Sequence, residues 1–202
     1  MYTSKSHLIL GFHGCEKQDQ EKLLTDIQYF KHSQNEYDWL GHGMYFWENN
    51  PERARQWALQ KRKAGTLQEP AVIGAVIDLG RCFDLLDSTH IGLLKQGYAL
   101  FLKESEALNH PIPRNENHPK STENDRTLRY LDCAVIEYTM QFLEKNSARP
   151  FDSVRAVFVE GKPIYPDAGF NEKTHIQVSI INPNCIKGFF LERKMEGNHP
   201  AV

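Results

Sequence analysis

Two short segments combine histidine, glycine and aromatic residues in a pattern that suits a flat, polar ligand. The first is Gly11-Phe12-His13-Gly14-Cys15, and the second is Gly41-His42-Gly43-Met44-Tyr45-Phe46-Trp47. Glycine lets a ligand approach the backbone because it carries no Cβ. An aromatic side chain directly after such a glycine offers a flat face to a ligand ring. Together the two segments predict a clamp for a nucleotide with an aromatic base.

The elements that must position these segments follow from hydrophobic periodicity. An apolar run at 7–13 predicts a strand that ends in the first glycine turn. The second segment lies between a polar loop at 34–40 and a helix that starts at Asn50-Pro51-Glu52, with asparagine as the cap and proline in the first turn. Periodicity further predicts strands at 71–79, 153–160, 174–181 and 186–191, and helices at 19–30, 88–106 and 128–145.

The order of these elements predicts a mixed α+β architecture, with helices packed on strands. A chain of 202 residues suits one domain with a substantial core. Residues 109–126 contain three prolines and almost nothing to bury, so they are expected to form a long exposed loop within the domain. A second loop, punctuated by glycine and proline, is expected at 161–171.

Composition narrows the classes of protein that this chain can belong to. The formal net charge is −2, so no global basic field indicates nucleic-acid binding, although a local basic face is compatible with this balance. The sequence has no apolar stretch long enough to span a membrane and no secretory signal, which predicts a cytoplasmic protein. The four cysteines form no C-x-x-C pair and are expected to be reduced thiols. The nine histidines show no metal-binding spacing, so no metal site is expected.

A His-Gly pair at the end of the first strand, followed by Gly-x-Tyr-Phe before a capped helix, resembles the ADP-ribosyltransferases. The similarity is to the PARP-like and diphtheria-toxin-like branch, and its motifs are His13-Gly14 and Gly43-Met44-Tyr45-Phe46. The resemblance implies a single domain with a split antiparallel β-sheet core flanked by helices. It also implies NAD as co-substrate. His13 would contact a ribose hydroxyl, Gly14 would contact the nicotinamide amide through its backbone, and Tyr45 would stack on the ring.

This site would break the bond between nicotinamide and ribose. The reaction passes through an oxocarbenium-like state in which positive charge develops on the ribose. A protein helps by gripping the carboxamide, fixing the ribose hydroxyls and placing negative charge or a lone pair nearby. Backbone amides beside glycine, an aromatic platform, a histidine and a carboxylate would supply these functions. The cofactor-binding set is therefore expected to be His13, Gly14, Gly43, Tyr45 and Phe46.

The carboxylate that this family places at the start of a late strand is not at the matching position, where this chain has Thr174. Three substitutes are open. Glu172 lies two residues earlier and would steer the acceptor. Alternatively, a bulge would turn His175 and Gln177 into the site, or Glu160 would reach across from the preceding strand. The catalytic set expected from the resemblance is therefore His13 and Tyr45, with Glu172 ranked ahead of Gln177.

The expected function is transfer of a single ADP-ribose from NAD to a macromolecular acceptor, because PARP-like members without the glutamate transfer one unit. The acceptor is a protein or a nucleic acid, and a toxin or defence effector of this kind would have an antitoxin protein as a further partner. Two alternatives stay open. One is an inactive module that binds NAD or ADP-ribose, and the other is an NAD-dependent RNA 2′-phosphotransferase.

Overall fold

A seven-stranded sheet forms the centre of the protein, whose computed structural model describes residues 8–119 and 125–193. Neighbouring strands in the sheet run antiparallel, except for one parallel pair at one edge. In spatial order the strands are β4 (Cys82–Asp84), β7 (Ser153–Phe158), β8 (His175–Ile180), β2 (Met44–Glu48), β1 (Leu8–Glu16), β3 (Pro70–Asp78) and β9 (Ile186–Phe190). This is a mixed α+β domain, as the order of predicted elements indicated.

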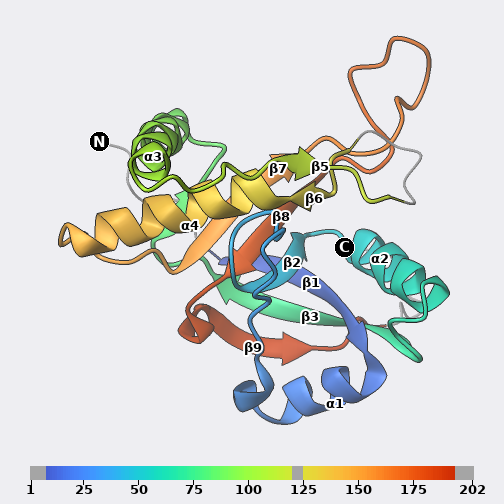
Figure 1. The fold of residues 1–202 in the computed structure, drawn as a ribbon. Helices are drawn as coiled ribbons and strands as arrows, with labels where there is room; N and C mark the ends of the chain where they lie inside the picture. The colour runs from blue at the N-terminus through green and yellow to red at the C-terminus, as the bar shows by residue number, and fades with distance from the viewer. Residues whose placement is uncertain (1–7, 120–124, 194–202) are drawn as a thin grey trace.

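Four helices pack around the sheet (Figure 1). They are α1 (Lys17–Thr25), α2 (Pro51–Lys63), α3 (Ser88–Ala107) and α4 (Tyr130–Lys145). Helices α3 and α4 lie together at the end of the sheet that holds β4 and β7, whereas α2 packs on β1 and β3. Helix α1 joins β1 and packs near β3 and β9. Short 3₁₀ turns occur at Ile27–Tyr29 and Pro183–Cys185. No helix in the two described segments is long and apolar enough to cross a membrane.

The strand alternation divides the side chains of the central strands between two faces of the sheet. One face carries Phe46 and Val178, which pack with Ile73 and with Leu23 of α1. The opposite face carries Tyr45 and its neighbours, and it packs against α2 and α4. The chain therefore has two apolar layers, one on each side of the sheet.

The start of α2 forms as the sequence predicts. The Asn50 side chain accepts a hydrogen bond from the backbone N–H of Arg53 at 3.0 Å, and Pro51 occupies the first turn. The helix ends before Gly65, whose φ of +78° is a left-handed conformation that glycine adopts without strain. This cap fixes where the first turn of α2 lies relative to β2.

Several boundaries differ from those expected. The helix predicted at 128–145 begins at Tyr130, because Leu128–Arg129 forms strand β6 and pairs with β5 (Asn115–Glu116) inside the predicted 109–126 loop. Residues 120–124 of that loop lie outside the described residues. The helix predicted at 19–30 ends at Thr25 and is followed by a 3₁₀ turn. Strand β4, with three residues, was too short to give a periodic signal.

The connection between β7 and β8 forms an arm that projects from the body of the molecule (Figure 1, orange loop). Its stem is antiparallel: the Lys173 backbone N–H donates to Glu160 O at 3.0 Å, and the Glu172 N–H donates to Lys162 O at 2.9 Å. Large apolar side chains in the arm are exposed, and they are Ile164, Tyr165 and Phe170. The loop predicted at 161–171 is thus present, with a defined stem.

Candidate functional site

Strands β1 and β2 separate at the predicted nucleotide clamp. Their ladder pairs Gly11 with Glu48 and Phe12 with Trp47 and extends no further along β1, whereas β1 pairs with β3 over its full length. A sheet that is continuous on one side and open on the other exposes backbone groups along the open edge. The main sheet is thus one continuous sheet with a local split, rather than two separate halves.

Gly14 directs its backbone into this split. Leu10 accepts a hydrogen bond from the Asn49 N–H at 2.8 Å, so Leu10, Phe12 and Gly14 point their peptide groups toward β2 by strand alternation. If the ladder continued two residues beyond Phe12, Gly14 would lie opposite Tyr45. However, β1 and β2 are no longer paired at that point. The N–H and C=O of Gly14 therefore face the gap, where a ligand amide would find both a donor and an acceptor.

The His13 imidazole bridges the split in place of a backbone pair. Its Nδ1 lies 2.7 Å from the carbonyl oxygen of Tyr45. Because a carbonyl only accepts, Nδ1 carries the proton. Burial lowers the pKa of His13 below its usual 6.5, which favours the neutral ring. Nε2 is then a hydrogen-bond acceptor, the chemistry needed to hold a ribose hydroxyl.

Tyr45 has a structural contact that the sequence did not indicate. Its hydroxyl donates to the Gly41 carbonyl at 2.6 Å and accepts from the Leu40 N–H at 2.7 Å. Its ring points away from the face on which His13 packs near Phe46, with ring centroids 5.7 Å apart. The phenol and the imidazole therefore do not flank one ligand from the same face; the backbone of Tyr45 lies between them.

Replacing Tyr45 with phenylalanine is expected to lower the free energy of unfolding by about 1–3 kcal/mol, because two backbone groups lose their partner. Urea denaturation measures the change. The control is Tyr37→Phe, at a residue that is 39% exposed, for which little change is expected. Equal stability of the two variants would show that the contacts of the Tyr45 hydroxyl contribute nothing.

Phe46 is not a cofactor contact, because its side chain is 0% exposed and packs with Ile73, Ile77 and Val178. That part of the sequence prediction is wrong: alternation along β2 sends Phe46 into the core. Gly43 is required for packing instead, since a Cβ there would collide with the Ser179 hydroxyl oxygen of β8. The second motif thus positions β2 against β8.

The structure separates two predicted catalytic residues, Gln177 in β8 and Glu172 before it. Gln177 lies opposite Trp47 and is 8% exposed, on the same face of the sheet as Tyr45. Glu172 is exposed in the stem of the arm, five positions before Gln177, which places it on the order of 15 Å farther along the strand. Thr174 is also exposed. Ser179, opposite Tyr45, is the polar side chain of β8 nearest in register to the split, and Gln177 lies nearer to it than Glu172 does.

No bulge is needed to bring His175 and Gln177 to the face that α2 and α4 cover. Strand β8 pairs regularly with β7 from Phe158 opposite His175 to Ser153 opposite Ile180. The regular strand buries His175 and Gln177 without the bulge that was considered from the sequence. Glu160 also lies on this side, where it contacts His175 (Nδ1–Oε2 3.7 Å).

A buried ion pair joins α2 to the end of β7. Arg53 Nη2 donates to Glu160 Oε2 at 2.8 Å, and the two side chains are 8% and 14% exposed. Desolvation raises the pKa of Glu160 above its usual value despite the attraction of Arg53. Burial lowers the pKa of His175 to about 4, and the positive charges of Arg53 and Arg129 add to this effect.

Aromatic rings extend from this ion pair in both directions. Trp47 lies 5.8 Å from Trp57 of α2 and 6.3 Å from His175, measured between ring centroids. Trp39 lies 6.3 Å from His175 on the other side. No role for Trp39 or Trp57 was predicted from the sequence. Strand period 2 places Trp47 on the same face as Tyr45, and that signal was available in the sequence.

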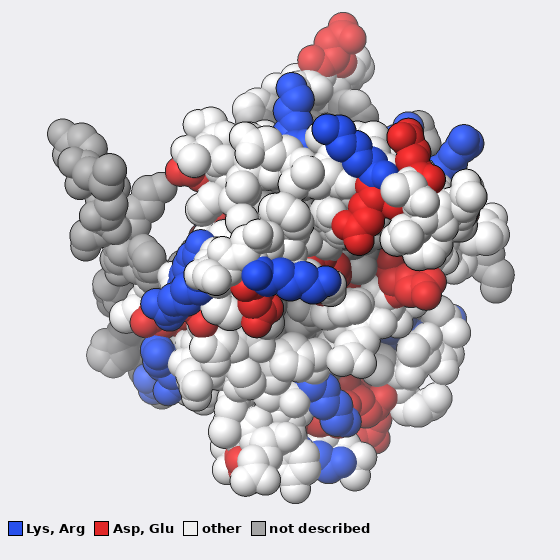
Figure 2. Space-filling model, turned by 60° about the vertical axis from the view of Figure 1, so that its left-hand side comes forward, with Lys and Arg blue, Asp and Glu red and all other residues white. Residues whose placement is uncertain are grey.

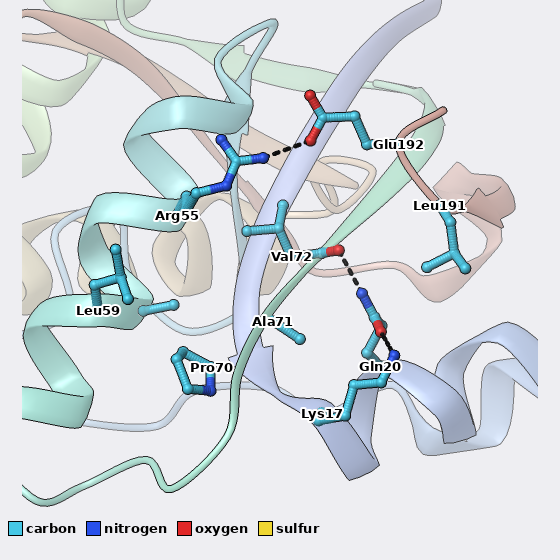
Figure 3. Close-up of a pocket in the computed structure, with 10 residues that line it drawn as sticks. Lys17, Gln20, Arg55, Leu59, Pro70, Ala71, Val72, Leu191 and Glu192 are labelled. Carbon is cyan, nitrogen blue, oxygen red and sulfur yellow. Dashed lines mark hydrogen bonds and ion pairs between the residues drawn. The ribbon is translucent and has the colours of Figure 1, made fainter. Parts of the chain in front are cut away.

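A separate hollow lies between α1, α2 and β3 (Figure 3), with a cavity volume of about 410 Å³. Its charged groups are already paired. Arg55 contacts Glu52 and Glu192, both at 2.6 Å, and Lys17 donates to Gln20, which in turn donates to the Val72 carbonyl. Figure 3 shows these side chains turned toward one another. Paired groups offer a ligand little, so the split is the stronger candidate site.

Other reactive chemistry is not evident. The four cysteines are free, and burial raises the pKa of each thiol, to about 12 for Cys15, Cys82 and Cys133. They are therefore poor nucleophiles. Within 8–119 and 125–193, no three His, Cys, Asp or Glu side chains gather so that they could hold a metal ion. Acidic and basic side chains are interspersed on the face in Figure 2, which carries no field of one sign.

The chain is similar to an uncharacterized protein of Methanocaldococcus jannaschii. The two are 27% identical over 196 aligned residues, which cover 87% of this chain and 83% of the relative. No family model and no solved structure matches the chain. The function must therefore be argued from the site itself.

Proposed function

We propose that this protein is an NAD-dependent mono-ADP-ribosyltransferase whose nicotinamide site is the split between β1 and β2. The observation that carries the proposal is the unpaired edge at Gly14, bridged by the neutral His13 ring. Backbone amide groups beside a glycine suit a carboxamide, and the lone pair on His13 Nε2 suits a ribose hydroxyl. The resemblance of both motifs to PARP-like and diphtheria-toxin-like ADP-ribosyltransferases supports the same assignment.

In this proposal each group acts on the developing oxocarbenium ion of NAD. The Gly14 backbone holds the nicotinamide amide, and His13 fixes the ribose. Gln177, which is 8% exposed on the face of the sheet opposite to His13, orients the acceptor through its amide. Tyr45 positions the split through its bonds to the segment at 40–41. An amide at this position cannot take a proton, so the acceptor must be a group that is nucleophilic without a strong base.

Release of nicotinamide from NAD tests the proposal. His13→Ala is expected to lower the rate about 100-fold, because a preorganised contact to the reacting sugar is lost. The matched control is His110→Ala, at an exposed residue, which is expected to retain the wild-type rate. The rate of nicotinamide release is expected to fall in Gln177→Ala as it does in His13→Ala, whereas in Glu172→Ala it is expected to stay near the wild-type rate. If no nicotinamide is released with any cell extract as acceptor source, transferase activity is excluded.

A second candidate is a module that binds NAD or ADP-ribose without chemistry, favoured by the lack of a carboxylate at position 174. Thermal-shift titration with NAD, ADP-ribose and nicotinamide separates binding from catalysis. A shift with NAD but no nicotinamide release supports the module. Activity as an RNA 2′-phosphotransferase would need several Arg and His side chains on one phosphate, and the split itself presents His13 alone.

The arm at 161–171 is suited to contact a macromolecular acceptor, because Ile164, Tyr165 and Phe170 are exposed on it. A toxin or defence effector acting in the cytoplasm is the biological role that the resemblance supports, and an antitoxin protein is then a further partner. Nuclease or protease treatment of product labelled from NAD would identify the acceptor class.

A further inference from the structure

Three buried nitrogen atoms without hydrogen-bond partners lie in one side-chain cluster outside the split. They are Trp47 Nε1, Arg53 Nε and His175 Nε2. Their side chains come from β2, α2 and β8 and are 4%, 7% and 5% exposed. Buried polar atoms in native proteins are nearly always paired. Three unpaired atoms from three elements therefore indicate that something else completes this cluster.

The contacts among these side chains hold them in one place. The ring centroids of Trp47 and His175 are 6.3 Å apart, and Arg53 donates to Glu160, whose carboxylate lies 3.7 Å from His175 Nδ1. The Arg53 guanidinium is held on a second side, because its Nη1 donates to Gln56 Oε1 at 3.2 Å. The unpaired nitrogens thus belong to a rigid, preorganised group.

The hydrogen-bonding character of the cluster is mixed. Trp47 Nε1 and Arg53 Nε can only donate. His175 Nδ1 lies 2.6 Å from the Lys173 carbonyl and so carries the proton of the neutral ring, which leaves Nε2 as an acceptor. A phosphate or carboxylate offers acceptors alone, and an ammonium group offers donors alone. The matching partner carries both kinds of group on one edge, as a nucleobase does.

Half-buried aromatic rings border the cluster on two sides. Trp57 contacts Trp47, and Lys61 Nζ lies 5.2 Å above the Trp57 ring. Trp39 is near-parallel to the His175 ring, with an interplanar angle of 27°, and the Arg129 guanidinium lies 4.5 Å from the Trp39 ring. Aromatic faces with cations beside them are the usual platform for an unpaired base.

We propose that this cluster binds one base of a single-stranded nucleic acid. The base edge is held by Trp47, Arg53 and His175, and its ring stacks on Trp57. The inference deepens the proposed function and rests on it in one respect: the bound base would be the ADP-ribose acceptor, reached by Gln177, which shares a face of β8 with His175. Base binding itself needs no NAD.

The test measures binding of fluorescein-labelled oligonucleotides by anisotropy without NAD. The probes are a mixed-sequence single-stranded RNA, the same sequence as DNA, the matching duplex and a mixed-sequence peptide. We expect one of the single strands to bind, and the duplex to bind at least about 10-fold more weakly because its bases are stacked. Binding of the peptide alone, or of no probe, would overturn the inference and leave a buried water as the partner of these nitrogens.

Variants locate the bound base. Trp57→Leu is expected to weaken single-strand binding about 10-fold, since one stacked base contributes that much. Arg53→Gln is expected to weaken it too, and Trp57→Leu keeps the test valid if loss of Arg53 prevents folding. The matched control is Arg55→Gln, on the same helix but outside the cluster, with less than about twofold effect. Equal losses for Trp57→Leu and Arg55→Gln would place binding elsewhere. Strand binding without nicotinamide release would refute only the proposed function.

Discussion

An alanine at position 14 is expected to lower the free energy of unfolding by about 1–3 kcal/mol, although it adds a single methyl group. A Cβ on Gly14 would lie 2.6 Å from the Ala54 carbonyl oxygen and 3.1 Å from the Trp57 ring. Neither neighbour can yield freely, because Ala54 is 0% exposed and belongs to the α2 backbone. Relief requires α2 to move away from β1. Urea denaturation of Gly14→Ala measures the cost.

Two other glycines provide controls for this prediction. Gly188 on β9 and Gly92 on α3 have open space where a Cβ would be. Gly188→Ala is expected to be nearly neutral, and Gly92→Ala is expected to stabilise by about 0.5–1 kcal/mol, because alanine favours the helix. A Gly14→Ala protein as stable as these controls would mean that α2 does not press on β1. Because displacement of α2 would also disturb β1 beside the split, we expect nicotinamide release to fall in the same variant.

Acidification from pH 6.5 to pH 4 is expected to remove about 3 kcal/mol of stability through His175. Its pKa is about 4 in the folded protein, against 6.5 for an ordinary histidine. Between these values the unfolded chain binds more protons than the folded one, so stability rises with pH across this window and falls on acidification. His13, whose pKa is also lowered, acts in the same direction. Glu160, whose pKa is raised, acts in the opposite direction.

The variant that isolates this effect is His175→Gln. Glutamine keeps a polar side chain but does not titrate, so the loss of stability between pH 6.5 and pH 4 should shrink by about 3 kcal/mol relative to wild type. His110→Ala, at an exposed residue, should leave the profile unchanged. An unaltered pH profile in His175→Gln would show that its imidazole is not buried in the neutral form.

Sequence patterns predicted the long elements better than the short ones. The helix at 88–106 and the strand at 71–79 were found almost to the residue, since each holds enough apolar positions to fix its period. Strands β5 and β6 have two residues each, and no periodicity exists at that length. Their pairing depends on the approach of segments that the local sequence does not encode. The same limit hid the parallel pairing of β4 with β7.

The candidate site was predictable in part. The sequence placed His13, Gly14 and Tyr45 near one another, and the structure brings them together around the split. The sequence could not show that the Tyr45 hydroxyl hydrogen-bonds to the backbone of Leu40 and Gly41, because those contacts depend on the conformation of a turn. The ranking of Glu172 above Gln177 depended on loop geometry that only the register of β8 determines. That register favours Gln177.

The buried Arg53–Glu160 pair was missed for a different reason. Arginine and glutamate 107 positions apart in sequence are each ordinary surface residues until folding brings them together. In the sequence Arg53 stands among the basic residues of its helix, and such residues usually form a solvated face. Burial of such a pair contributes little net stability, but loss of one partner leaves a charge in the interior. Its retention in the interior fits a site that needs fixed donors better than a purely structural role.

The projecting connection between β7 and β8 makes the chain selectively vulnerable to proteases. Its apolar side chains are exposed, and its backbone is held by the rungs of its own stem and by one bond from the Gly161 N–H to Asp125 Oδ2 at 3.1 Å. A brief digestion with chymotrypsin should cut near Tyr165 or Phe170 and give two fragments that stay associated, because the β7–β8 ladder and the central sheet hold both pieces. The nicked protein would keep the split intact while losing its most prominent apolar protrusion, and it would thereby separate NAD chemistry from capture of a large partner.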